Sequence, residues 1–344
     1  MPRWLSSLEA SWHRWAERRD EKRLDRVQHP FWTIVHKEIA DHVHSWRFII
    51  LIALISLTCL GSLYSALMAI REVGTSDEVD KSFFVLKLFT ISGNSLPSFL
   101  TFVSFLGPLL GIGMGFDAVN SERNKGTLSR VMSQPIHRDY LLNAKFVAAL
   151  ILISVMFVAL SLLVLGMSLY MLGIPPTPEE VLRILAFDVL VVFYIGFWLN
   201  LSIAFSVRFK QPATSALAAI AVWLFFAVFF SMLIELILNA VRPPQTASTE
   251  QIIGFLQFSD FINRLSPSHL FNEATITLLV PTTNNLSSFL TPEQVYGSLP
   301  GTPLSLGQSL LLVWPQMTGL FAATMICFAI SYVMFMRQEI RSRN

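Results

Sequence analysis

The sequence is poor in charge and almost free of cysteine, and each shortage narrows the class of protein. Only 14% of its 344 residues are charged, while 53% are apolar. Soluble domains carry about 25% charged residues, so this composition indicates a membrane protein. Cys59 and Cys327 both lie in apolar runs, so neither a disulfide framework nor a cysteine metal site is expected. The first long apolar run starts only at Phe48, behind a basic segment and without a small-residue cleavage site after it, so we expect no secretory signal.

Motifs for catalysis and nucleotide binding are missing as well. The sequence has no GxxxxGK loop followed by Ser or Thr to cradle ATP phosphates, no GxSxG turn and no catalytic Cys/His pair. His36, His42 and His44 are spaced so that they do not share one face of a helix, and the HExxH pattern is absent. We therefore expect no enzymatic activity in the chain itself, no bound metal or cofactor, and no nucleic-acid partner.

Long apolar runs are what the sequence has instead. A helix needs about 20 apolar residues to cross the hydrocarbon core of a bilayer, and backbone polar groups cannot stay unpaired in lipid. Six runs meet this requirement: 48–70, 98–116, 146–172, 184–207, 213–238 and 310–336. The predicted fold is an all-α integral membrane protein, with a six-helix transmembrane domain over 48–344.

The positive charges are distributed unevenly between the two sides of these spans. Of the 25 Lys and Arg residues, 19 lie in the segments 1–47, 117–145, 208–212 and 337–344, which all fall on one side. The positive-inside rule places these segments, and hence both termini, in the cytoplasm. The longest outer loop is then 239–309, which is either functional or a passive cap over the bundle.

The N-terminal residues 1–47 show two amphipathic stripes. Trp and Leu recur at helical spacing over residues 4–15, with Arg between and beyond them, and a second stripe over residues 32–46 runs into the first span. Trp with Arg suits the membrane interface. We predict an in-plane helix joined to the first span by an elbow, and the alternative is a solvated basic arm.

Small and polar residues inside the spans suggest further sites. Gly107, Gly111 and Gly115 recur every four residues, a spacing that lets another helix approach closely, either within the bundle or in a second subunit. Asp188 and Glu235 are acids inside predicted spans, about one turn from the outer ends, and could line a substrate path or form a solvated rim. Asn200 lies deeper; a hydrogen bond between helices is the simpler role for it, and a ligand contact is the alternative. No chain of acids crosses the bilayer, which argues against a proton-coupled carrier.

The cytoplasmic loop 117–145 interrupts the apolar sequence with charge. We predict that the second span continues into it, that Gly126 breaks this helix, and that Thr127 caps a short helix over 128–133 which Pro135 ends. The short helix would present an apolar side ringed by charge, made of Leu128, Val131, Met132, Glu122, Arg123, Arg130 and Arg138. Such a patch is typical of a partner site. An ordinary solvated connection is the alternative.

The same loop carries a family resemblance. It contains the pattern E-x3-G-T-L-x6-P-x2-R-x3-L-x2-K, formed by Glu122, Gly126, Thr127, Leu128, Pro135, Arg138, Leu142 and Lys145. This pattern resembles the signature of type-2 ATP-binding-cassette (ABC) transporter permeases. Residues 31–46, 265–275 and 332–341 also resemble the connecting helix, the segment after the fifth span and the C-terminal end of such permeases. His137 departs from the Ser-like cap that is frequent in the family, and we predict that Asp139 replaces it.

The resemblance implies a type V exporter-like permease in a bacterial-type cytoplasmic (inner) membrane. The short helix would be a coupling helix seated in a separate ABC ATPase, present in two copies, which binds ATP and Mg²⁺. The implied coupling residues are Glu122, Gly126, Thr127, Leu128, Val131, Met132, Pro135 and Arg138. A second permease subunit, identical or different, would complete the pathway, with the glycine face as a candidate contact.

Two other functions stay open at this stage. The same machine could transmit force to an extracytoplasmic protein through the loop 239–309 without transporting anything. An unrelated carrier or membrane enzyme would need a site at Asp188 or Glu235.

Overall fold

The computed structural model describes residues 30–73, 83–92, 96–133, 137–173, 175–244, 248–281 and 304–337. All regular secondary structure in these ranges is helical. The helices before the third predicted span are α2 Pro30–Val43, α3 Trp46–Val73, α4 Phe84–Thr90, α5 Phe99–Gly115, α6 Asn120–Asn124 and α7 Thr127–Met132. They are followed by α8 Arg138–Leu172, α9 Pro178–Arg208, α10 Pro212–Leu224, the π-helix η1 Phe225–Phe229, α11 Phe230–Val241, α12 Thr249–Asn263, α13 Pro267–Leu279 and α15 Leu306–Met336. The Trp-rich stripe predicted over residues 4–15 lies outside the described residues.

Within these described ranges, six helical segments are long and apolar enough to cross a membrane, which confirms the predicted all-helical fold with six spans. They are Trp46–Ile70, Phe99–Asn124, Arg138–Met171, Pro178–Arg208, Pro212–Val241 and Leu306–Met336. The fourth segment begins six residues earlier than the predicted 184. Its start is fixed by Thr177, whose hydroxyl accepts from the Glu180 amide while the Glu180 carboxylate accepts from the Thr177 amide.

Helix α9 is the centre of the bundle. It packs against α5, α8, α10, α13 and α15, and its large side chains Phe187, Tyr194 and Trp198 are fully buried. By contrast, only 17% of the most apolar window of Pro212–Val241 is buried, against 67% for α9. The fifth span therefore faces outward, toward lipid or another chain.

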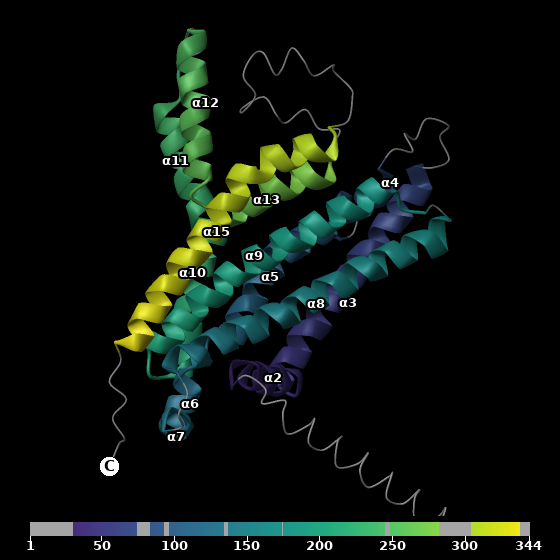
Figure 1. Cartoon of the computed structure of the whole chain (residues 1–344). Helices are drawn as coiled ribbons and strands as arrows, with labels where there is room; N and C mark the ends of the chain where they lie inside the picture. Colours follow the sequence, from purple (N-terminus) through teal and green to yellow (C-terminus); the bar gives the residue numbers. More distant parts are fainter. Residues whose placement is uncertain are drawn as a thin grey trace, which may run out of the picture.

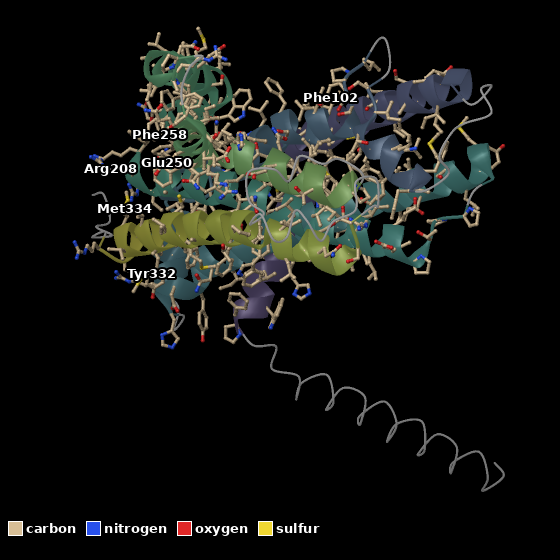
Figure 2. All side chains as sticks on the ribbon, turned by 90° about the horizontal axis from the view of Figure 1, so that it is seen from above. Phe102, Arg208, Glu250, Phe258, Tyr332 and Met334 are labelled. Carbon is tan, nitrogen blue, oxygen red and sulfur yellow. The ribbon has the colours of Figure 1, made fainter. Side chains whose placement is uncertain are left out.

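The two ends of the bundle carry different elements (Figure 1). At one end, α2 lies crosswise to the spans, close to α6 and α7, and α15 ends on the same side. At the other end, α11 and α12 stand up beside the bundle, and α13 packs on α15 and α9. Figure 2 shows the α12 side chains Glu250 and Phe258 gathered at one side when the molecule is seen from above.

The crosswise helix α2 matches the position predicted for an in-plane helix before the first span. It ends at Val43, and α3 begins three residues later at Trp46. One side of α2 packs on α8, through Val35 against Ala144 and Ala148. Trp32 and Trp46 are exposed, which suits contact with the membrane interface.

Candidate functional site

The connection between the second and third spans is fastened to α9 at its base. The backbone amides of Val119 and Asn120 both donate to Ser206 Oγ, at 2.9 and 3.2 Å. Asn124 Nδ2 donates to the carbonyl of Lys210 at 3.0 Å. These hydrogen bonds tie α6 and the residues beside it to the end of α9.

The turn into α7 depends on a glycine. Gly126 has φ +71°, a left-handed conformation that strains any other residue, although no atom lies within 4 Å of a Cβ placed there. The short helix spans Thr127–Met132, one residue earlier than predicted. Thr127 is its first residue and not its cap, since the Thr127 hydroxyl donates to the Glu122 carbonyl at 3.2 Å.

The outward surface of this tip differs from the predicted apolar patch. Leu128 is only 2% exposed and belongs to the main hydrophobic core, so α7 turns this side chain into the protein and not toward a partner. Lys125, Arg130 and Arg138 are exposed, so the described part of the tip is basic. The side chains of Val131 and Met132, and the whole of Pro135, lie outside the described residues.

Helix α8 starts at Arg138, inside the 117–145 loop, close to Asp139, where a helix leading into the third span is expected from the sequence. His137 occupies the N-cap position, and its side chain makes no capping hydrogen bond. The prediction that Asp139 replaces the cap is corrected, because Asp139 lies in the first turn of the helix, where a negative charge favours the helix dipole.

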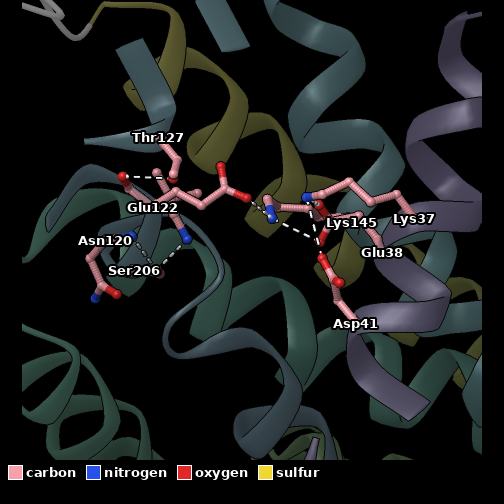
Figure 3. Close-up of polar contacts among 9 residues, drawn as sticks. Lys37, Glu38, Asp41, Asn120, Glu122, Thr127, Lys145 and Ser206 are labelled. Atoms are coloured by element: carbon pink, nitrogen blue, oxygen red, sulfur yellow. Dashed lines mark hydrogen bonds and ion pairs between the residues drawn. The ribbon is translucent and has the colours of Figure 1, made fainter. Parts of the chain in front are cut away.

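Lys145 is the centre of a buried ion cluster that joins three elements (Figure 3). Its ammonium lies 2.8 Å from Glu38 Oε2 on α2 and 2.7 Å from Glu122 Oε1 on α6. The side chains of Lys145 and Glu38 are each 6% exposed, and that of Glu122 is 15% exposed. Two largely buried carboxylates thus share one lysine, which holds α2, α6 and α8 together.

A second layer of ion pairs surrounds this cluster. Lys37 contacts Glu38 at 3.1 Å and Asp41 at 3.3 Å, from a half-exposed position on α2. Burial alone would raise the pKa of Glu38, but the charges and hydrogen bonds of Lys145 and Lys37 lower it below its ordinary value. Near the elbow, Arg47 pairs with Asp117.

The three polar residues predicted inside spans have different surroundings. Asp188 is 3% exposed and accepts a hydrogen bond from Ser161 of α8 at 2.7 Å. It lies about three turns inside α9, because that helix begins at Pro178, so the solvated rim predicted for Asp188 is corrected. Asn200 donates to the Thr324 carbonyl of α15 at 3.4 Å, whereas Glu235 is exposed on α11.

The glycine face of α5 packs against α9 of the same chain. A Cβ on Gly111 would lie 2.7 Å from the Ile195 carbonyl oxygen, and one on Gly115 would lie 2.8 Å from the Leu199 carbonyl oxygen. Gly107 also faces the Ile195 side chain. Because α9 covers this face, a second subunit cannot pack against it in this structure.

Sequence reasoning missed one buried residue at the opposite end. In the sequence, Arg183 is one of the few positive charges assigned to the outer side of the spans. In the structure its side chain is fully buried. It donates to the carbonyls of Leu278 at 2.9 Å and Leu304 at 2.6 Å, and to Ser309 Oγ at 3.0 Å. Arg183 therefore ties α9 to α13 and to the start of α15, and no spacing in the sequence indicates these carbonyl partners.

Comparison with known proteins agrees with this architecture. Two bacterial proteins named "Probable ABC transporter permease protein NosY" are similar to the chain. The one from Pseudomonas aeruginosa is 26% identical over 211 residues, which cover 60% of this chain and 70% of the relative. The one from Stutzerimonas stutzeri is 23% identical over 208 residues, covering 59% and 68%. The sequence profile of the ABC-2 family of transporter proteins matches residues 32–340, nearly the whole described structure. This chain, a multi-pass membrane protein, belongs to the ABC-2 transporter family.

Proposed function

We propose that the chain is the membrane-spanning permease subunit of an ABC exporter of the type V kind. ATP hydrolysis on a separate ATPase subunit, docked at the 117–145 loop, drives it. ATP and Mg²⁺ bind to that ATPase and not to this chain. The membrane is the bacterial-type cytoplasmic (inner) membrane, and both termini lie in the cytoplasm.

The buried cluster around Lys145 is the observation that carries this proposal. A docked ATPase can move spans only if the element that it pushes is rigidly joined to them. Lys145 joins the loop to α2 and α8, and Ser206 joins it to α9. In this account α7 is the coupling helix and α2 is the connecting helix of the family.

The charge of the tip defines the surface expected on the ATPase. Three exposed cations lie on α7 or close to it in sequence: Lys125, Arg130 and Arg138. A cleft with acidic residues at its rim would complement them, and this complementarity would set the association rate and the register. Because two tips are needed to follow the closing of an ATPase dimer, we expect two ATPase subunits and two permease subunits.

The second permease subunit, identical or different, would pack against an outward-facing helix. The fifth span is the best candidate, because its side chains are the least buried of the six segments. The glycine face of α5 is excluded from this role by its contact with α9.

One observation favours a second candidate function, the transmission of force to an extracytoplasmic protein. Helix α12 buries none of its residues; it exposes Phe258 and Phe261 on the outer side, and Leu265 is exposed just beyond its end. An exposed aromatic surface of this kind suits a protein contact. Capture of an outer protein without any efflux would support this function over export.

Copurification from the native membrane tests the proposed function. The full chain, extracted in mild detergent, should bring down a stoichiometric protein with a Walker A loop. Arg138→Glu should weaken this association at least about tenfold, because it reverses a rim charge and adds repulsion against an acidic cleft.

Arg337→Glu is the matched control, since Arg337 is an exposed arginine at the end of α15 and not on the loop that carries α7. It should retain the ATPase. Equal retention by both variants would place the ATPase elsewhere, and an intact preparation without any ATPase would contradict the proposed function.

A further inference from the structure

A cavity of about 550 Å³ opens beside the Lys145 cluster. Helix α2, the start of α3, the loop elements α6 and α7, and the ends of α5, α8 and α9 all contribute to its wall. One part of the wall is charged and another part is apolar, so the cavity suits a ligand that has both characters.

The charged part of the wall has an excess of positive charge. Each of its four acids faces a cation of the same wall: Glu38 and Glu122 face Lys145, Asp41 faces Lys37, and Asp117 faces Arg47. Two further cations of the wall, Lys125 and Arg130, are exposed and have no ion pair within the described part of the chain. The cavity therefore has room for an anion at the loop side.

The apolar part of the wall lies where the spans meet the cytoplasmic loop. Phe48 and Leu51 come from the first two turns of α3, and Met114 from the last turn of α5. Leu199 and Ile203 of α9 complete it. These residues lie at the ends of three of the six segments that are long and apolar enough to cross a membrane, so an acyl chain of the adjacent leaflet could reach them.

We propose that this cavity binds an anionic phospholipid of the leaflet that borders the loop. The phosphate would contact Lys125 and Arg130, and an acyl chain would run along Phe48, Leu51 and Met114. The lipid would thus touch α3, α5, α7 and the turn after α6 together, and it would link the loop to the first two spans. The site depends on the proposed orientation only for the identity of the leaflet, which would be the cytoplasmic one.

Native mass spectrometry of the full chain in detergent tests the site without any ATPase or transport readout. The probes are dioleoylphosphatidylglycerol, dioleoylphosphatidylcholine and inorganic phosphate. The two lipids have the same acyl chains and differ in net charge, so their ratio reports the head group. The wild-type chain should retain the anionic lipid about tenfold more strongly than the zwitterionic one.

The double variant Lys125→Gln/Arg130→Gln should lose this preference, with anionic lipid binding reduced about tenfold. The matched control Lys210→Gln/Arg208→Gln removes two exposed charges from the same side but none from the cavity wall, and it should keep the preference. Ala118→Phe fills the cavity without changing any charge and should reduce anionic lipid binding as well.

Three results would overturn the proposal. An equal loss of anionic lipid binding in both double variants would show that the preference depends on the general surface charge and not on the cavity. Competition by inorganic phosphate at the same concentration as the lipid would assign the cations to a soluble anion. Absence of anionic lipid adducts from the folded wild-type chain would leave Lys125 and Arg130 to the ATPase contact alone.

Discussion

Replacing Lys145 by methionine should release α2 from the 117–145 loop. Methionine keeps the length of the side chain and removes only the ammonium that Glu38 and Glu122 share. The two carboxylate oxygens then face each other. Their separation cannot exceed the sum of 2.8 Å and 2.7 Å, about 5.5 Å.

The magnitude follows from Coulomb's law. At an effective dielectric constant of about 20, two like charges about 5.5 Å apart repel by about 3 kcal/mol. Protonating one of the two glutamates at pH 7 would cost about as much free energy as this repulsion, so protonation would not remove the destabilisation. The loss of a buried pair partner generally costs about 3–5 kcal/mol, which agrees with this value.

Hydrogen exchange of the α2 peptides, followed by mass spectrometry on the full chain in detergent, measures this loss. About 3 kcal/mol corresponds to about 100-fold faster exchange in Pro30–Val43 if α2 opens locally. Lys37→Met is the matched control, because it removes a lysine that contacts Glu38 but has a side chain that is 58% exposed. That variant should accelerate exchange less than about fivefold.

A second variant separates repulsion from a general loss of structure. Adding Glu38→Gln to Lys145→Met removes one of the two facing charges and should restore most of the protection of α2. The reasoning is refuted if Lys145→Met and Lys37→Met accelerate exchange equally, or if Glu38→Gln gives no rescue.

Three further outcomes are expected. Gly111→Ala should lower the melting temperature in detergent, because the added Cβ would lie 2.7 Å from the Ile195 carbonyl oxygen and overpacking costs about 1–3 kcal/mol. Gly166→Ala is the control, since no atom lies within 4 Å of its added Cβ, and it should leave the melting temperature unchanged. Equal effects of the two variants would contradict the close packing of α5 on α9. Arg183→Leu should speed hydrogen exchange at the start of α15 by at least about tenfold, because it leaves the carbonyls of Leu278 and Leu304 without their donor. Unchanged exchange there would contradict the role of Arg183 in holding α15 to α9. The pKa of Glu38 is lowered in the folded chain, so its stabilising effect is complete above pH 4.5 and is lost as the pH falls through the folded pKa. The opening of α2, taken from exchange rates corrected for their intrinsic pH dependence, should therefore increase in acid in the wild type and increase less in Glu38→Gln; an equal increase in both would contradict the assignment.

The fold was predictable because lipid imposes simple requirements. Apolar runs of sufficient length indicate helices, and all six predicted spans are helical segments of the structure. The first and last residues of the helices were harder to predict from the sequence. Helix α9 begins at Pro178, in polar sequence before the predicted span, because a helix continues wherever caps allow and not only where lipid requires it.

The candidate site was predictable in its elements and not in its contacts. The pattern from Glu122 to Lys145 located the loop, and the turn at Gly126 follows from its glycine. Glu38 lies 107 residues from Lys145 in sequence, so only the fold shows that they are partners. Leu128 was expected to be exposed because a short apolar stripe looks the same whether a partner or the chain's own core covers it.

Photo-crosslinking from the loop tip tests the central claim most directly. A photoreactive residue at Lys125, which is exposed beside α7, should crosslink in the native membrane to a protein that carries a Walker A loop. The same residue at Phe258, exposed on α12 at the other end of the molecule, should not. A Walker A protein crosslinked from Phe258, or none crosslinked from Lys125, would contradict the account that an ATPase drives this chain through its 117–145 loop.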